Sequence, residues 1–147
     1  MANYTLEDTK KLAERVAEKL IPGDVIALSG DLGSGKTTFV KFLVEALGFD
    51  SKVQSPTFVI CRKYVGGKGP IKVINHIDLY RIQNKVELEG LGVSELLTER
   101  DAISVIEWPD LIEDKLPQGT MKITFEYIDE EKRRVNARDL YRFDRKI

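Results

Sequence analysis

The stretch VIALSGDLGSGKTTF, residues 25–39, decides the fold. Residues 25–28 are a short continuous apolar run, which is the pattern of a buried parallel strand. A glycine-rich segment follows and leads into a predicted helix from about Lys36 to Leu47, which Gly48 ends. A strand, a glycine loop and a helix in this order are the context in which the pattern GxxxxGK[ST] indicates a phosphate-binding P-loop.

The loop GDLGSGKT, residues 30–37, has the chemistry that phosphate binding needs. Its glycines permit backbone conformations that side chains would hinder, so several N–H groups can converge on phosphate oxygens. We expect Lys36 to reach the β- and γ-phosphates of a nucleoside triphosphate, and the Thr37 hydroxyl to bind Mg²⁺. A glycine-rich turn that merely precedes Lys-Thr is the alternative, which the flanking strand and helix disfavour. Nucleotide contacts are predicted for Asp31, Gly33, Ser34, Gly35, Lys36, Thr37 and Thr38.

The rest of the chain predicts an α/β fold, a three-layer P-loop NTPase-type domain with a mixed, mainly parallel central sheet and few helices. Apolar residues at three- and four-residue spacings indicate an amphipathic helix over residues 5–20. Short helical pieces are expected within residues 83–99, and residues 95–99 fit best. Further strands are predicted at residues 58–65, 71–77, 102–106, 121–127 and 134–140.

Length and composition fit a single P-loop ATPase domain spanning residues 1–147. Hydrophobic residues make up 42% of the chain and the net charge is −1, so the molecule as a whole does not attract nucleic acid. One cysteine and one histidine exclude an intrachain disulfide and a zinc cluster. The sequence has no apolar signal-peptide core and no run of about 18 apolar residues, so we expect a cytoplasmic protein that has no membrane partner.

Two acids follow predicted strands and are candidates for a second magnesium partner and for placing the attacking water. Glu107 follows the apolar run of residues 103–106, and Asp78 follows residues 73–77. Ligands of α/β sheets lie beyond the carboxyl ends of parallel strands, so either acid can serve the loop. The alternative for each is a solvated acid at a strand end.

Three further features near these acids have more than one interpretation. Residues 75–78, NHID, resemble the guanine-reading motif of GTPases, but they lack its lysine and lie within a predicted hairpin, so we reject that function. No second soft ligand accompanies His76, which we interpret as a polar residue at a strand end. Trp108, beside Glu107, fits either the core or the site. The hydroxyls of residues 55–57 could orient water or phosphate, or satisfy the local backbone.

Together these motifs resemble the TsaE family, also called YjeE, the small bacterial ATPases of threonylcarbamoyladenosine tRNA modification. The resemblance rests on GDLGSGKTTF at residues 30–39, SPTF at residues 55–58, HIDLYR at residues 76–81 and EWP at residues 107–109. Their order and spacing cover about residues 5–110, and the first and third motifs together are quite specific. The C-terminal part of the chain has no motif that matches.

The resemblance implies ATP and Mg²⁺ as cofactors, and a role for each matching position. Lys36 and Thr37 would belong to the nucleotide and magnesium site, with Glu107 as the second acid at the magnesium. Asp78 would lie in a switch-like segment that hydrolysis needs. The implied catalytic residues are thus Asp78, Glu107 and Lys36. Further positions near the nucleotide would be Thr57, Trp108 and, close to the base, Thr9.

The resemblance also implies a partner, the TsaB–TsaD heterodimer, which transfers the threonylcarbamoyl group to adenosine 37 of tRNA, so that tRNA is reached through the complex. The main alternative is a small-molecule kinase with the same P-loop, although no lid insertion is evident and only Arg81 lies beside a candidate acid. A scaffold that binds nucleotide without turnover is a third possibility. The basic stretch from Arg133 to Lys146 is interpreted as a solvated strand face, because acids are interspersed.

Overall fold

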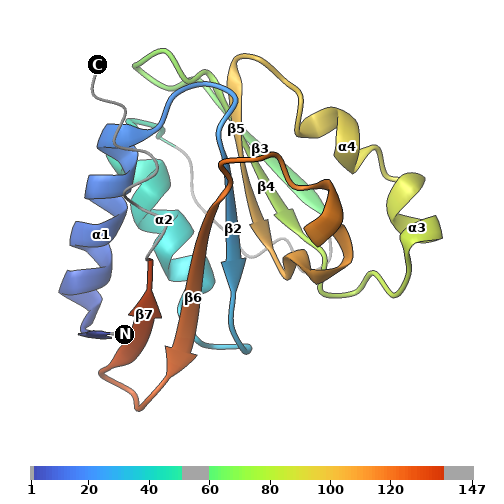
Figure 1. Ribbon diagram of the computed structural model, residues 1–147. Coiled ribbons are helices and arrows are strands. Elements are labelled where there is room, and N and C mark those ends of the chain that lie inside the picture. The colour runs from blue at the N-terminus through green and yellow to red at the C-terminus, as the bar shows by residue number, and fades with distance from the viewer. Residues whose placement is uncertain (1, 51–59, 138–147) are drawn as a thin grey trace.

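The computed structural model describes residues 2–50 and 60–137, which contain a seven-stranded sheet with the order β1-β7-β6-β2-β5-β4-β3 (Figure 1). The strands are β1 (Ala2–Tyr4), β2 (Val25–Ser29), β3 (Cys61–Val65), β4 (Val73–Asp78), β5 (Ala102–Glu107), β6 (Met121–Tyr127) and β7 (Arg133–Asn136). The central strands β6, β2, β5 and β4 run parallel, whereas β7, β1 and β3 pair antiparallel with their neighbours. The prediction of a mixed sheet with a mainly parallel centre is confirmed.

Helices cover both faces of this sheet, which gives the three predicted layers (Figure 1). α1 (Leu6–Lys19) and α2 (Lys36–Ala46) pack against each other over one face. α3 (Lys85–Glu89), α4 (Val93–Leu96) and the 3-10 segment η1 (Pro109–Lys115) cover the other face. The fold is therefore α/β, as the sequence predicts.

Each face of the sheet has its own hydrophobic core, because successive side chains of a strand point to opposite faces. Along β4, Ile74 joins the core under α1 and α2, whereas Ile77 joins the core under α3 and α4. In the larger core Phe39 of α2 meets Phe125 of β6, with ring centroids 5.7 Å apart. A central strand such as β5 is therefore buried on both faces, whereas β6 alternates buried and exposed residues.

The N-terminal helix is predicted over residues 5–20 and spans Leu6–Lys19, one residue shorter at each end. Thr5 is the N-cap of α1 and forms a capping box with Asp8: the Asp8 N–H donates to Thr5 Oγ1 at 3.2 Å, and the Thr5 N–H donates to Asp8 Oδ2 at 3.0 Å. Leu12 and Val16, one turn apart, face the core. The capping box thus sets the start of α1, and the amphipathic pattern sets the face that it buries.

The structure differs from the predicted elements in short segments. β1 and η1 are not predicted, because segments of three and seven residues have too little periodicity to be recognised. α3 is one of the short helical pieces expected within residues 83–99. β1 exists only because Ala2–Tyr4 pairs with β7 from the other end of the chain. The predicted helix at residues 95–99 lies earlier, at Val93–Leu96. Residues 58–59 and 138–140 of two predicted strands lie outside the described residues.

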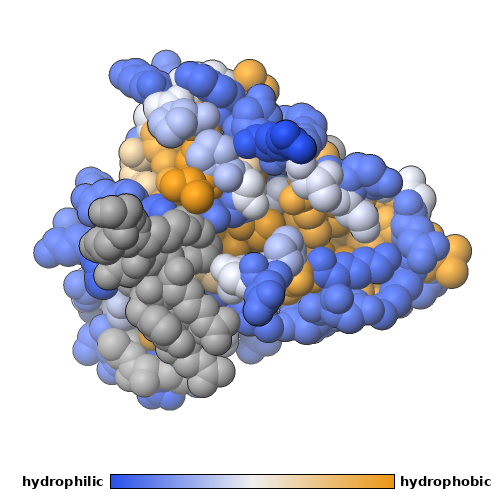
Figure 2. Space-filling view, turned by 45° about the horizontal axis from the view of Figure 1, so that its top comes forward, coloured by the Kyte–Doolittle hydropathy of each residue, from blue (hydrophilic) through white to orange (hydrophobic). Residues whose placement is uncertain are grey.

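The face covered by α3 and α4 leaves apolar side chains in view. Figure 2 shows them among hydrophilic residues in the part of the molecule where Figure 1 places these helices. Val86 is 80% exposed and Leu91 is 43% exposed. Within the described residues, no helix has the length and apolar character needed to cross a membrane.

Candidate nucleotide-binding site

The loop between β2 and α2 turns sharply because glycines take positions that other residues rarely adopt. Gly30 has a φ of 143°, and Gly35, the N-cap of α2, has a φ of 111°. A Cβ atom at Gly30 would lie 2.4 Å from the carbonyl oxygen of Phe125, so a side chain does not fit there. The positive end of α2 therefore lies close to the carboxyl end of β2, which is the arrangement that binds phosphate.

Lys36 opens α2, and only 4% of this residue is exposed. Its Nζ donates to the carbonyl oxygen of Gly30 and lies 3.6 Å from the centroid of the Trp108 ring, a cation–π contact. Burial lowers the pKa of Lys36, and the carboxylates of Glu107 and Asp78 oppose this effect. The Lys36 ammonium group can exchange its contacts with the Gly30 carbonyl and the Trp108 ring for contacts with phosphate oxygens.

Glu107 ends β5 beside β2, the strand that leads into the loop. Both of its carboxylate oxygens lie 3.4 Å from the hydroxyl oxygen of Thr37. Carboxylate and hydroxyl are hard oxygen ligands of the kind that Mg²⁺ accepts. The described part of the chain holds no group of three or more His, Cys, Asp or Glu side chains able to bind a metal ion. A hydroxyl and a carboxylate at this spacing fit a magnesium ion that completes its shell with water and nucleotide phosphates.

Asp78 ends β4, and its register partner on the neighbouring strand is Glu107. The backbone N–H of Tyr80 donates to Asp78 Oδ1 at 2.9 Å, which fixes the carboxyl group at the strand end. Burial raises the pKa of Asp78, against the Tyr80 hydrogen bond, and the charge of Glu107 raises it further. A buried acid with a raised pKa beside a second acid is typical of functional sites. Parallel neighbouring strands thus bring the two predicted acids to one edge of the sheet.

His76 lies on the same face of β4 as Asp78 and is fully buried. Its Nε2 is 2.6 Å from Glu107 Oε2, and its Nδ1 is 3.4 Å from the hydroxyl of Tyr64 on β3. The interpretation of His76 as a plain polar residue at a strand end is therefore wrong. The signal was available in part, since residues 76 and 78 share a strand face and the strand runs parallel to one that ends in an acid.

Two adjoining cavities lie along this edge of the molecule. The smaller, about 250 Å³, is lined by Lys36, Thr37, Glu107 and Trp108 together with the glycine loop. The larger, about 390 Å³, lies between β1, the start of α1 and the turn that joins β6 to β7. Gly35, Thr38 and Arg133 line both cavities. The two spaces therefore lie side by side, separated by no more than these shared residues.

Arg133, at the start of β7, is a site residue that the sequence interpretation missed. Its Nε is buried and has no hydrogen-bond partner among the described residues, although its NH1 donates to the carbonyl oxygens of Asp129 and Lys132. The guanidinium also stacks on the Tyr127 ring at 4.7 Å from its centroid. The interpretation of the basic stretch as a solvated strand face is therefore wrong for Arg133. Arg134, half exposed and 3.6 Å from Glu126, does fit that description.

The other predicted nucleotide contacts take different positions. Thr9 is buried in α1, donates from its hydroxyl to the Thr5 carbonyl at 3.2 Å, and lines the larger cavity. Ser34 Oγ is buried and has no partner among the described residues, so a phosphate oxygen would satisfy it. Asp31 is exposed in the loop. Thr57 lies outside the described residues.

Comparisons with known proteins agree with this architecture. The family model described as "Threonylcarbamoyl adenosine biosynthesis protein TsaE" matches residues 4–135. The chain belongs to the TsaE family. The tRNA threonylcarbamoyladenosine biosynthesis protein TsaE of Bacillus subtilis is 40% identical over 129 residues, 88% of this chain and 78% of that protein. The TsaE protein of Aquifex aeolicus is 41% identical over 131 residues, 88% of this chain and 87% of that protein.

A solved protein structure also has this fold. The crystal structure of Bacillus subtilis YdiB superposes with a TM-score of 0.71 at 31% sequence identity, and covers 91% of this chain and 82% of that one. The family match confirms the resemblance that the sequence motifs predict. The TsaE family takes part in tRNA threonylcarbamoyladenosine biosynthesis.

Proposed function

We propose that the protein binds ATP with Mg²⁺ and hydrolyses it, and that this turnover supports threonylcarbamoyl transfer to adenosine 37 of tRNA. It would do so in the cytoplasm, by acting on the TsaB–TsaD complex, so that tRNA is reached only through that complex. The observation that supports ATP binding best is that Lys36, Thr37 and Glu107 line one cavity, and that a second cavity adjoins it at Thr38. Family membership supports the pathway.

In this proposal each side chain has a limited task. Lys36 exchanges its contact with Gly30 for the β- and γ-phosphates, while Thr37 and Glu107 hold the magnesium ion directly or through water. Bound Mg²⁺ would neutralise charge on the phosphates during transfer. Asp78, fixed by the Tyr80 N–H, would orient the attacking water. The larger cavity beside Thr9 and Thr38 would receive the base.

A partner is part of the proposal because the P-loop is open to water. Leu32 in the loop is 65% exposed, and Tyr80, which stacks on Trp108 with ring centroids 5.0 Å apart, is 45% exposed. An open site excludes water poorly and hydrolyses slowly. A docked TsaB–TsaD pair would cover these side chains and order the segment that follows Asp78. We therefore expect weak ATPase activity alone and stronger activity with the pair.

The test mixes purified protein, TsaB and TsaD, and measures phosphate release and co-elution with and without ATP. Stimulated release and a nucleotide-dependent complex are expected, and the Lys36→Ala variant should lose both. Phosphate transfer to a small metabolite, without a complex or stimulation, would favour the small-molecule kinase instead. If the protein bound ATP but released no phosphate even in the complex, the proposed hydrolysis would be wrong. The protein would then be a scaffold that binds nucleotide without turnover.

A further inference from the structure

A line of buried polar groups connects the edge of the sheet to the P-loop. It begins at the Tyr64 hydroxyl on β3, passes through the His76 ring on β4 and the Glu107 carboxylate on β5, and ends at the Thr37 hydroxyl on α2. His76 is fully buried, Glu107 is 3% exposed and Tyr64 is 5% exposed. Three neighbouring strands thus contribute one side chain each to a line that ends at the start of the helix.

The shortest contact in this line is the one between His76 Nε2 and Glu107 Oε2, at 2.6 Å. The two contacts of Glu107 with Thr37 are each 3.4 Å, long for hydrogen bonds between oxygens. A buried carboxylate needs a partner, because a desolvated and unpaired charge is costly. Among the described residues, His76 is therefore the side chain that fixes where the Glu107 carboxylate points.

We propose that His76 is a positioning residue, which donates from Nε2 to one oxygen of Glu107 and thereby holds the other oxygen toward the magnesium ion beside Thr37. The inference rests on the proposed Mg²⁺ and ATP site and adds a residue to it. Ligands of a metal are commonly held by hydrogen bonds from residues behind them, and loss of such a bond weakens metal binding about 10- to 100-fold.

The chemistry of the ring agrees with this role. A carboxylate that binds a metal can only accept a hydrogen bond, so the Nε2 atom facing it must carry the proton. In the neutral ring Nδ1 is then an acceptor, and the Tyr64 hydroxyl is the group that faces it. The β3–β4 hairpin would in this way keep the ring in one tautomer and one orientation.

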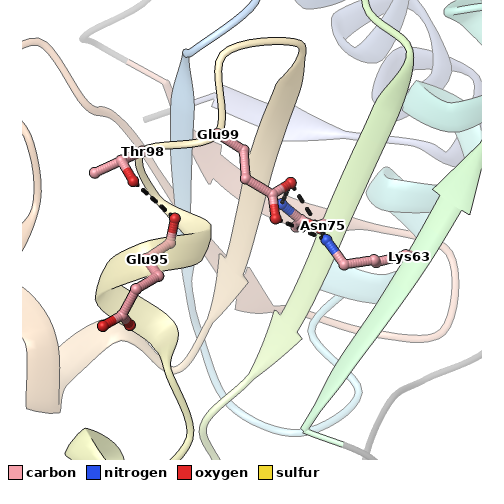
Figure 3. A network of polar contacts seen from close by, with 5 residues as sticks. All are labelled: Lys63, Asn75, Glu95, Thr98 and Glu99. Carbon is pink, nitrogen blue, oxygen red and sulfur yellow. Dashed lines mark hydrogen bonds and ion pairs between the residues drawn. The ribbon is translucent and has the colours of Figure 1, made fainter.

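The neighbour of His76 on the same strand offers a matched control. Asn75 is fully buried too, but it points to the other face of the sheet, where its side chain contacts Lys63 Nζ at 2.8 Å and Glu99 Oε2 at 3.2 Å (Figure 3). Replacing Asn75 disturbs the same hairpin without touching Glu107. It therefore measures what a general weakening of β4 does to the site.

Two substitutions of similar polarity separate positioning from packing. In His76→Gln the amide nitrogen reaches the place of Nε2, and in His76→Asn it reaches only the place of Nδ1. The readout is ADP affinity by calorimetry, first in EDTA and then at stepped concentrations of magnesium chloride. Fluorescence of Trp108, the single tryptophan, gives a second readout beside Lys36.

His76→Asn should raise the Mg²⁺ concentration for half-maximal tightening of ADP binding about 10- to 100-fold, whereas His76→Gln should stay close to the parent. ADP affinity in EDTA should be unchanged in both, and Asn75→Ala should leave the Mg²⁺ dependence as it is. In a Glu107→Gln background His76→Asn should add no further shift, because the group it positions is gone.

The inference would be overturned if His76→Asn and His76→Gln had the same Mg²⁺ dependence. It would also be overturned if His76→Asn lost as much ADP affinity in EDTA as it loses in the presence of Mg²⁺. A parent protein whose ADP binding ignores Mg²⁺ would refute the magnesium site and the inference together. If the His76→Asn shift is found but TsaB and TsaD do not stimulate hydrolysis, the inference stands and the proposed function fails.

Discussion

The helices that cover the two faces of the sheet differ greatly in length. α1 and α2, of 14 and 11 residues, close a large core that reaches across β2, β5 and β6. α3 and α4, of five and four residues, cover a smaller core. Val86 and Leu91 remain exposed on this second face. The comparison separates a thickly packed half from a lightly covered one.

The candidate site lies where the two halves meet. Lys36 and Thr37 belong to α2 and so to the thickly packed half. Asp78 ends β4, and Tyr80 lies in the turn between β4 and α3. Segments with few buried apolar contacts open locally at lower free energy than the core. We infer that nucleotide binding depends mainly on the first half, and turnover on the end of β4 that the second half supports.

The largest effect that would sharpen this comparison concerns Asp78. Asp78→Ala should slow ATP hydrolysis about 10²- to 10⁴-fold, because a group that orients or activates water acts mainly in the transition state. Nucleotide affinity should stay within about threefold of the parent. Single-turnover kinetics and calorimetry measure the two quantities. Parallel losses of affinity and rate would place Asp78 among the binding residues and remove the division between the halves.

Lys36→Ala tests the other half. Loss of a charge-assisted contact with phosphate costs about 2–3 kcal/mol, so nucleotide affinity should fall roughly 30- to 150-fold. The fall should appear in titrations with ATP and with ADP, since the lysine is expected to reach the β-phosphate as well. A variant that binds as tightly as the parent would contradict the assignment of the loop.

A pair of core substitutions compares the packing directly. Leu43→Ala, in α2, should lower the free energy of unfolding by about 2–5 kcal/mol and reduce hydrogen-exchange protection throughout the sheet. Leu88→Ala, in α3, should reduce protection mainly in α3, α4 and η1, because its smaller cluster can open by itself. Hydrogen exchange with mass spectrometry distinguishes the two. Loss of protection throughout the sheet in both variants would show a single cooperative unit.

The smallest expected effect is on stability and pH. Burial raises the pKa of Asp78 above its ordinary value of 3.8, so the ionised side chain destabilises the fold at neutral pH. Asp78→Asn should therefore raise Tm at pH 7. The gain should shrink as the pH falls through the raised pKa and vanish below 3.8, where the acid is protonated both folded and unfolded. Thermal melts across this range are the measurement. A difference in Tm between Asp78→Asn and the parent that stays constant at all pH values would exclude this electrostatic cause. The control is Glu14→Gln, at an exposed position on α1, which should leave Tm as in the parent.

Local patterns in the sequence predicted what depends on local physics. The strand–loop–helix of residues 25–39 predicted the P-loop, because glycine conformations and the run of apolar residues are properties of neighbours in the chain. The apolar periodicity of residues 5–20 predicted α1 and the face that it buries. Acids at strand ends predicted Asp78 and Glu107 as candidates, since parallel strands end at one edge of the sheet.

Only the tertiary structure decided which of these groups meet. Thr37 and Glu107 are 70 positions apart, and they become neighbours because β5 pairs with β2. His76 reaches Glu107 because β4 adds to β5, and Arg133 reaches the P-loop cavity because β7 returns beside β6. The order of strands in a sheet depends on long-range packing, which no local pattern encodes. The sequence by itself thus determined the glycine loop between β2 and α2 and its candidate partners, and folding determined their contacts.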